Sequence, residues 1–394
     1  MFVQNKPADM EQKLKMGMVG GGGDATIGVL HRMAAQLDGG IELVAGAFSS
    51  NAERSRRCGE RLGLHSARIY SDYFAMATEE AKLSKGERID FVSIVTPNHL
   101  HFPVAKAFLE SGFNVVCEKP MTFDLNEALE LRSLVAKSQK VFAVTYSYTG
   151  YPMVKQAREM VRRGELGKIL KVITEYPQGW RSNPLESTEQ DQVWRNDPDR
   201  AGATGCLGDI GTHVENLSRY ITGLEIDELC ADFTKFGAGQ RLEDDANLLV
   251  HYKGGARGIM HCSKISTGEE NHLNIRAYGT DASLEWDQEH PNEHIVKYAN
   301  ASRRTLRRGN DYVSDIARRV TRLIRGQPEG YIEAFANIYT EAARAIEAEI
   351  SGQRIPESCD FPRVDDGVAG MAFVDAAVES VKSGGVWTKM KNIQ

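Results

Sequence analysis

The stretch from Met16 to Ala34 reads MGMVGGGGDATIGVLHRMA, and it decides the fold. Four consecutive glycines follow a short apolar run and precede a segment with the apolar spacing of a helix. Glycine lets the backbone turn tightly after a strand, and the N-terminus of the next helix favours a bound phosphate. A glycine-rich hinge is the structural alternative, so the rest of the chain decides between the two interpretations.

The residues from about 15 to 147 alternate apolar runs with amphipathic stretches. The runs are rich in Val, Ile and Phe without strict polar alternation, which is typical of strands buried on both faces. One helix-like stretch begins with Asp124 as a predicted N-cap and carries Glu127 three residues later. The alternation predicts an α/β domain with a doubly wound parallel sheet. Six runs are expected as strands, at 16–19, 41–48, 68–70, 90–96, 114–119 and 141–147.

The pattern changes after residue 147. A helical segment, a strand and a long polar loop lead to another helix that begins near Leu207. Five strand-like runs then follow closely between residues 228 and 287, separated by turn signals such as KGGA and YGTDA. This spacing predicts a second α/β domain with an open, largely antiparallel sheet.

Composition excludes several classes of partner. The chain has 394 residues and a formal net charge of −6, which argues against nucleic acid. No apolar segment approaches the roughly 18–20 residues that span a bilayer, and the polar N-terminus does not resemble a signal peptide. Six scattered cysteines without a C-x-x-C pair are expected to be buried thiols, with no metal site. We therefore expect a cytoplasmic protein without a membrane partner.

The glycine run occupies the strand–turn–helix context of a dinucleotide-binding turn. One reading of G-x-G-x-x-A uses Gly20, Gly22 and Ala25, and a second uses Gly23, Ala25 and Gly28, so the register stays open. Cofactor contacts are expected from Gly20, Gly22, Gly23, Ala25, Thr26 and Ile27.

The end of the second predicted strand bears on the choice of cofactor. Ser49 and Ser50 stand where an acidic residue usually binds the adenosine ribose, and Arg54 follows one helical turn later. A hydroxyl with a nearby guanidinium can accept a 2′-phosphate. Alternatively, Ser50 is a helix N-cap and Arg54 is solvated, so NAD and NADP both remain open as cofactors.

Two further motifs end predicted strands. TPNHLH offers Thr96, Pro97, Asn98 and His101 to a cofactor, whereas a metal at its two histidines lacks a third ligand nearby. CEKP places Glu118 and Lys119 at the next strand end, before a proline that can be cis. The lysine can hydrogen-bond a substrate hydroxyl and lower the pKa of a neighbouring acid.

The segment GDIGTH carries Asp209 and His213 at positions i and i+4. On a helix this spacing puts both side chains on one face. A histidine beside a carboxylate is a suitable proton acceptor near neutral pH. A structural ion pair is the alternative interpretation.

Together, GGGGDATIG, TPNHLH, EKP, WRNDPDRAG, GDIGTH and PEGYIEAFANIY resemble the Gfo/Idh/MocA family of nucleotide-dependent oxidoreductases. The resemblance covers residues from about 14 to about 390. It implies a loose N-terminal arm (1–14), a Rossmann dinucleotide-binding domain (15–147) and a C-terminal domain (148–394) for substrate binding and oligomerisation.

The resemblance also implies an activity. Family members oxidise or reduce a carbinol of a sugar, cyclitol or related polyol with NAD or NADP, and often pack as dimers or tetramers through the open sheet. By the same resemblance, Lys119, Asp209 and His213 form the catalytic trio, and Trp194 and Arg195 belong to a loop that reaches the cofactor. Alternatives are a glycoside hydrolase that oxidises its substrate transiently with retained NAD, and a non-catalytic cofactor sensor.

Substrate selection is expected from three further residues. Tyr148 follows the sixth predicted strand, Trp180 can stack on a sugar face, and Arg181 opens the polar loop 181–200. Packing between domains is the alternative role for the two aromatic residues.

Overall fold

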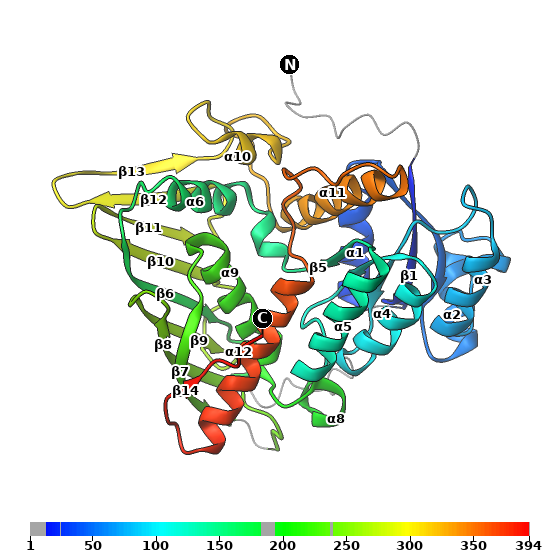
Figure 1. Ribbon diagram of the computed structural model, residues 1–394, viewed down its shortest axis with the longest axis horizontal. Coiled ribbons are helices and arrows are strands. Elements are labelled where there is room, and N and C mark those ends of the chain that lie inside the picture. Colours follow the sequence, from blue (N-terminus) through cyan, green and yellow to red (C-terminus); the bar gives the residue numbers. More distant parts are fainter. Residues whose placement is uncertain (1–12, 24, 183–193, 237–238, 394) are drawn as a thin grey trace. The chain divides into compact units, whose positions relative to one another are not determined.

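The computed structural model describes residues 13–23, 25–182, 194–236 and 239–393. It divides into two compact units (Figure 1). Of the described residues, the first contains those from 13 to 147 together with Phe335–Val368, and the second contains Tyr148–Ala334 and those from Ala369 onward. The first unit breaks off after Ser147, and residues 335–368 return to it. Of the expected N-terminal arm, residues 1–12 lie outside the described residues, and Leu14 already begins the first strand.

A five-stranded parallel sheet forms the centre of the first unit, in the order β2-β1-β3-β4-β5. Residues 68–70, expected as a strand, do not join it: a 3-10 turn (Ser66–Arg68) precedes Ile69, which makes an isolated bridge to Gly46. The strands are β1 (Leu14–Gly20), β2 (Ile41–Ala47), β3 (Phe91–Val95), β4 (Asn114–Cys117) and β5 (Phe142–Val144). The helices between them are α1 (Thr26–Gln36), α2 (Ala52–Arg61), α3 (Tyr73–Lys82), α4 (His101–Glu110) and α5 (Leu125–Ser138).

The local signals of the first unit are confirmed. All five residues of β3 and all four of β4 are buried, as expected for strands covered on both faces. The Asp124 side chain caps α5 by accepting the Glu127 N–H at 2.9 Å, which satisfies one of the orphan donors of the first turn. Helix α11 (Tyr331–Ile350) adds the buried Phe335 and Tyr339 to this unit.

The second unit contains a nine-stranded sheet in the order β13-β12-β11-β10-β6-β9-β8-β7-β14. It is mostly antiparallel, but β6 and β9 pair in parallel at its centre. The strands are β6 (Ile169–Pro177), β7 (Ile226–Thr234), β8 (Asp245–Tyr252), β9 (Arg257–Ser263), β10 (Asn274–Gly279), β11 (Ala282–Asp287), β12 (Glu293–Tyr298), β13 (Ala301–Arg307) and β14 (Thr388–Lys389).

Helices cover one face of this sheet (Figure 1). α9 (Thr212–Thr222) packs against β6, β9 and β10, and α6 (Pro152–Arg162) packs against β11 and β12. Burial alternates along the strands accordingly: in β8, Leu248 and Val250 are buried whereas Leu249 is 51% exposed. The remaining helices include α8 (Pro198–Ala201), α10 (Asp315–Arg319) and α12 (Val364–Lys382).

Candidate active site

The glycine turn joins β1 to α1 and leaves no room for side chains at three positions. A Cβ on Gly20 would lie 2.4 Å from the Val95 carbonyl oxygen, and one on Gly22 would lie 2.6 Å from Phe48. A Cβ on Gly28 would lie 2.2 Å from the carbonyl oxygen of Gly21. The turn therefore combines positions from both predicted registers, and Ala25 is the residue that precedes the helix.

The backbone of this turn is fixed by glycine conformations and by one side chain. Gly20, Gly21 and Gly23 all have positive φ angles, between +65° and +79°, which other residues adopt with strain. The Arg32 guanidinium donates to the Gly21 carbonyl at 2.9 Å. Thr26 and Ile27 open α1, so the turn presents backbone N–H groups at a helix N-terminus. Asp24 lies outside the described residues.

Polar atoms at the end of β3 fit a bound dinucleotide. Thr96 Oγ1 and His99 Nδ1 are buried, and neither has a hydrogen-bond partner among the described residues. Buried polar atoms without partners are costly, so they are normally matched by a ligand or water. Together with the glycine cradle, they make this edge of the sheet suitable for a nucleotide cofactor.

His101, predicted to contact the cofactor, is buried between two backbone carbonyl groups, and its cofactor contact stays a prediction. It is 1% exposed, with Nδ1 at 2.7 Å from the Pro120 carbonyl oxygen and Nε2 at 2.8 Å from that of Thr96. Burial lowers the pKa of the imidazole. Because both ring nitrogens face carbonyl oxygens of the protein, His101 connects the loops that follow β3 and β4. Pro97 and Asn98 lie in the loop that follows β3, where Pro97 precedes a 3-10 turn (Asn98–Leu100).

The EKP motif follows β4, and its glutamate is part of a buried network. Glu118 Oε1 lies 3.0 Å from His31 Nε2 and 2.5 Å from the Thr145 hydroxyl, and Oε2 accepts the Lys119 N–H at 3.1 Å. His31 Nδ1 in turn lies 2.6 Å from the Tyr339 hydroxyl. Burial raises the pKa of Glu118, but the hydrogen bonds of His31 and Thr145 together with the charges of His31 and Lys119 outweigh burial and lower it to about 2. The Lys119–Pro120 peptide is cis.

The expected adenosine end carries Ser49, Ser50 and Arg54. The cap of α2 is Asn51, whose side chain accepts the Arg54 N–H at 2.9 Å, so Ser50 is not the N-cap. Ser49 Oγ accepts the Asn51 N–H at 3.2 Å. Ser50 and Arg54 are exposed.

Asp209 and His213 lie in the second unit, on a helix that starts irregularly. Leu207–Gly211 form a π-helical turn, η5, which continues into α9 at Thr212. A Cβ on Gly211 would lie 2.6 Å from Leu207 Cδ1 and 3.1 Å from Cys262 Sγ, so a larger residue there would have to displace these side chains. The buried Glu243 carboxylate accepts the N–H groups of Gly205 and Leu207 at 2.9 Å and satisfies donors at the helix start. π-helical turns of this kind are frequent at functional sites.

Two cations lie beside the Asp209 carboxylate. Lys264 Nζ is 2.8 Å from Asp209 Oδ2, and Arg195 Nε is 3.8 Å from the same oxygen. The predicted loop residue Arg195 thus lies beside Asp209, with its guanidinium over the Trp194 ring at 4.7 Å. Lys264 was not predicted: it is 55 residues from Asp209 in the chain, and no local motif marks it.

Tyr148 supports His213 within the second unit. Its ring meets the His213 imidazole edge-on, with centroids 4.7 Å apart, and His213 is 6% exposed. The Tyr148 and Tyr176 hydroxyls are hydrogen-bonded to each other, and Tyr176 donates to Asn271 Oδ1 at 2.7 Å. Burial raises the pKa of both tyrosines, so both hydroxyls stay protonated. Tyr176 and Asn271 were not predicted from sequence.

Trp180 and Arg181 follow β6 on the same unit. The Arg181 guanidinium lies 4.7 Å and Lys264 Nζ 5.5 Å from the Trp180 ring centroid. Arg181 is 7% exposed and Trp180 partly buried, with its indole N–H donated to Gln178 Oε1 at 2.9 Å. Residues 183–193 of the predicted substrate loop lie outside the described residues.

Two family models match the chain. Residues 14–146 match an oxidoreductase family with a NAD-binding Rossmann fold, and residues 154–285 match the GFO/IDH/MocA C-terminal domain. The chain belongs to the Gfo/Idh/MocA family. As a family member it has a NAD-binding Rossmann domain followed by a domain with a mostly antiparallel sheet. The predicted family and fold class are confirmed.

Relatives of this Gfo/Idh/MocA chain include dehydrogenases. YfiI, an uncharacterized oxidoreductase of Bacillus subtilis (strain 168), is 38% identical over 97% of this chain and 98% of its own length. An inositol dehydrogenase homolog from Azotobacter vinelandii, solved with NAD+, has a TM-score of 0.94 at 38% identity and covers 98% of this chain and 99% of its own. Its structure with NADH and myo-inositol has a TM-score of 0.91 at 37% identity, covering 98% of this chain and 100% of its own.

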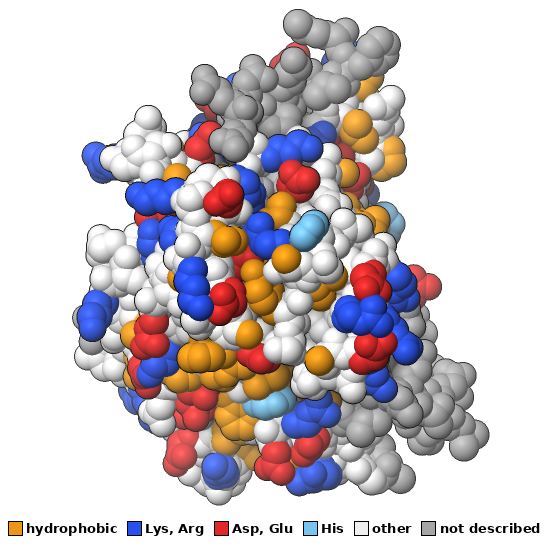
Figure 2. All heavy atoms as spheres, turned by 90° about the vertical axis from the view of Figure 1, so that its right-hand side faces the viewer, with side chains coloured by type: hydrophobic (Ala, Val, Ile, Leu, Met, Phe, Trp, Pro, Cys, Tyr) orange, Lys and Arg blue, Asp and Glu red, His pale blue; other side chains and the backbone are white. Residues whose placement is uncertain are grey.

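Other features bear on partners of this family member. Among the described residues, no group of three or more His, Cys, Asp or Glu side chains is arranged to hold a metal ion. No helix in the described ranges is long and apolar enough to cross a membrane. All six cysteines are free, and five are buried. Acidic and basic side chains are interspersed on the face shown in Figure 2.

The close packing of Gly28 against Gly21 yields a testable prediction. Gly28→Ala is expected to displace the glycine turn and to weaken NAD binding about 10–100-fold. The new Cβ would clash with the Gly21 carbonyl oxygen and so misplace the phosphate-binding backbone. Titration of NAD against intrinsic protein fluorescence measures this. Gly86→Ala is the matched control, since a Cβ there meets nothing within 4 Å. Equal affinity in Gly28→Ala and the control would contradict the assignment of the turn.

Proposed function

We propose that the protein is a NAD-dependent dehydrogenase or reductase that acts on a secondary hydroxyl or ketone of a polyol or sugar. One observation carries the proposal: a carboxylate and a histidine, Asp209 and His213, lie in the irregular first turns of one helix, in a unit that follows a NAD-binding domain. An inositol dehydrogenase homolog solved with myo-inositol and sugar dehydrogenases among the relatives support the substrate class. One of them is a levoglucosan dehydrogenase of Pseudarthrobacter phenanthrenivorans, 28% identical over 56% of this chain and 61% of its own.

The proposed chemistry divides between three residues. His213 accepts the proton of the substrate hydroxyl as the general base. The Lys119 ammonium stabilises the negative charge that develops on that oxygen. Asp209 remains an anion that orients the imidazole or holds a second substrate hydroxyl. NAD, when bound, supplies the hydride acceptor, and the glycine turn, Thr96 and His99 are the groups that hold it.

Substrate recognition is proposed for Trp180, Arg181 and Tyr148. Trp180 offers a partly buried ring beside two cations, which suits the C–H face of a ring polyol. Tyr148 is buried and packs on His213, which supports a role in setting the imidazole orientation. The second unit would thus bind the substrate.

Removing the general base tests the assignment. His213→Ala is expected to lower kcat about 10²–10⁴-fold with NAD affinity unchanged, because NAD binding resides in the other domain. Initial rates of NAD reduction are measured across a panel of inositols, sugars and glycosides. His290→Ala, an exposed histidine of the same unit, is the control. Full turnover in His213→Ala would refute the role, and glycoside cleavage without net NAD reduction would favour the hydrolase.

The adenosine end is proposed to accept NADP as well as NAD. Exposed Arg54 and the Ser49 hydroxyl can approach a 2′-phosphate, and no carboxylate of the described β2–α2 connection, residues 48–51, opposes it. Glu53, the nearest acid on α2, pairs with Arg56 and Arg57.

A charge substitution tests this proposal. Ser49→Asp is expected to lower kcat/KM for NADP at least about tenfold by charge repulsion and to preserve turnover with NAD. Arg54→Ala is also expected to lower kcat/KM for NADP, whereas Arg57→Ala serves as the control on the same helix. Steady-state kinetics measure kcat/KM for NAD and for NADP in each variant. An enzyme that never turns over NADP, or equal NADP kinetics in all variants, would contradict it.

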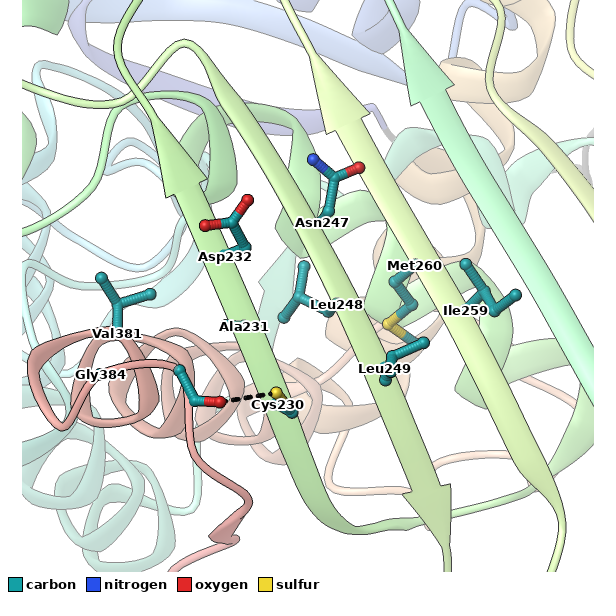
Figure 3. Close-up of a pocket in the computed structure, with 11 residues that line it drawn as sticks. Cys230, Ala231, Asp232, Asn247, Leu248, Leu249, Ile259, Met260, Val381 and Gly384 are labelled. Atoms are coloured by element: carbon teal, nitrogen blue, oxygen red, sulfur yellow. Dashed lines mark hydrogen bonds between the residues drawn. The ribbon is translucent and has the colours of Figure 1, made fainter.

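We also propose a cytoplasmic homo-oligomer that associates through the uncovered face of the nine-stranded sheet. Cys230, Leu249, Ile259 and Ile173 are register partners across β7, β8, β9 and β6, and form an apolar row on that face. Figure 3 shows the first three in place on adjoining strands. Leu249 is 51% and Ile259 36% exposed. A second copy is the proposed occupant, because a self-complementary apolar row is the usual core of an isologous interface.

Charges placed in this row test the interface. The double variant Leu249→Lys/Ile259→Lys is expected to shift the protein to a smaller species, since like charges would meet across the symmetry axis. Light scattering after size exclusion measures the mass. Phe74→Lys changes a 67% exposed side chain on α3 and is the control. An unchanged mass in the double variant would exclude this face as the interface.

A further inference from the structure

Lys264 is a buried lysine that the proposed chemistry does not use. It directly follows β9, and its side chain is 0% exposed. Its Nζ lies 2.8 Å from Asp209 Oδ2 and donates to the Gly205 carbonyl at 3.3 Å. A lysine is almost never fully buried unless it is paired, so the contact with Asp209 accounts for the burial of Lys264 and raises the question of what the pair does.

The backbone on both sides holds Lys264 in place. Its N–H donates to the Asp244 carbonyl at 2.8 Å, and its own carbonyl accepts the Arg181 N–H at 2.9 Å. The ammonium also lies over the Trp180 ring. These backbone hydrogen bonds fix the position of Lys264, and its side chain extends from there to Asp209.

The ion pair with Lys264 restricts the chemical roles that are open to the Asp209 carboxylate. The Asp209 side chain is 23% exposed, so its carboxylate is partly removed from water. An adjacent cation favours the ionised form of a carboxylate and occupies one of its oxygens. A carboxylate held in this way accepts hydrogen bonds in one orientation and does not act as a proton donor near neutral pH.

Other charged and titratable groups surround the pair. Arg195 of η4 (Trp194–Asn196) lies 3.8 Å from Asp209 Oδ2, and Arg181 interacts electrostatically with Asp209 and Asp244. Glu243 is buried and interacts with Lys264, but burial raises its pKa and its carboxylate accepts the N–H groups at the start of η5. Cys206 and Tyr176 also lie nearby, and burial raises the pKa of both groups; His213 follows on the same helix.

We propose that Lys264 is a positioning residue that holds Asp209 as a fixed anion for the reaction at His213. This rests on the proposed function. It selects one role for Asp209: a hydrogen-bond acceptor for the imidazole or a substrate hydroxyl, and not a general acid. Lys264 thus acts through Asp209 and need not touch the substrate.

Lys264→Met tests the proposal, because it keeps the length of the side chain and removes its charge. We expect kcat to fall about 10–100-fold, the effect of losing a charge-assisted hydrogen bond, with unchanged NAD affinity. The acid limb of kcat/KM against pH is expected to move up by about one unit or more, because Asp209 then protonates more readily. Lys264→Arg keeps the charge and is expected to retain the acid limb.

A second buried lysine provides the control. Lys155 on α6 is 1% exposed, and its Nζ lies 3.3 Å from the Tyr220 hydroxyl. Lys155→Met also removes a buried charge from the second unit, and it is expected to lower the melting temperature without moving the acid limb. An acid limb that stays in place in Lys264→Met, or moves equally in Lys155→Met, overturns the proposal.

The double variant Lys264→Met/Asp209→Asn removes both charges and keeps the test decisive if Lys264→Met does not fold. It is expected to match Asp209→Asn alone in kcat, because Lys264 acts through Asp209. A further loss of at least tenfold overturns the proposal. Full turnover in both His213→Ala and Asp209→Asn would instead refute the proposed function itself, so the two failures are distinguishable.

Discussion

The NAD-binding unit depends on one buried carboxylate. Glu118 of the EKP motif accepts hydrogen bonds from Thr145 after β5 and from the Lys119 backbone, and pairs with His31 of α1. His31 extends the network to Tyr339 of α11, a residue more than 300 positions later in the chain. A buried anion is stable only when its oxygens are matched, so this carboxylate constrains the glycine-turn helix, two strand ends and the returning segment together. The same carboxylate fixes the backbone N–H of Lys119, the lysine proposed to act in catalysis.

The second unit also contains a buried charge, of the opposite sign. Lys264 is a buried cation, and Asp209 is its matched anion at the start of an irregular helix. Glu243 satisfies the N–H groups of that helix start. Both units therefore bury a charge beside a predicted catalytic residue and match it with groups distant in sequence. Such networks keep a side chain in one orientation, which catalysis by positioned groups requires.

Local signals predicted most of the fold. The glycine run, the Asp124 cap and the apolar runs of five strands are visible in short stretches of sequence, and the structure contains them. The run 68–70 was expected as a strand because it is short and apolar, but it makes only one bridge to β2. The parallel pairing of β6 with β9 in the second sheet escaped prediction as well, since pairing across 86 residues leaves no local pattern.

The sequence by itself determined the fold class, the glycine turn and the motif residues at the strand ends, because backbone conformation and periodicity are local properties. Tertiary structure decided the partners of those residues. It assigned His101 to two backbone carbonyls, Tyr148 to the edge of His213, and Lys264 to Asp209. The physical reason is that a buried polar group must be matched wherever it lies, and the matching group is selected by proximity in the folded chain rather than by spacing along it.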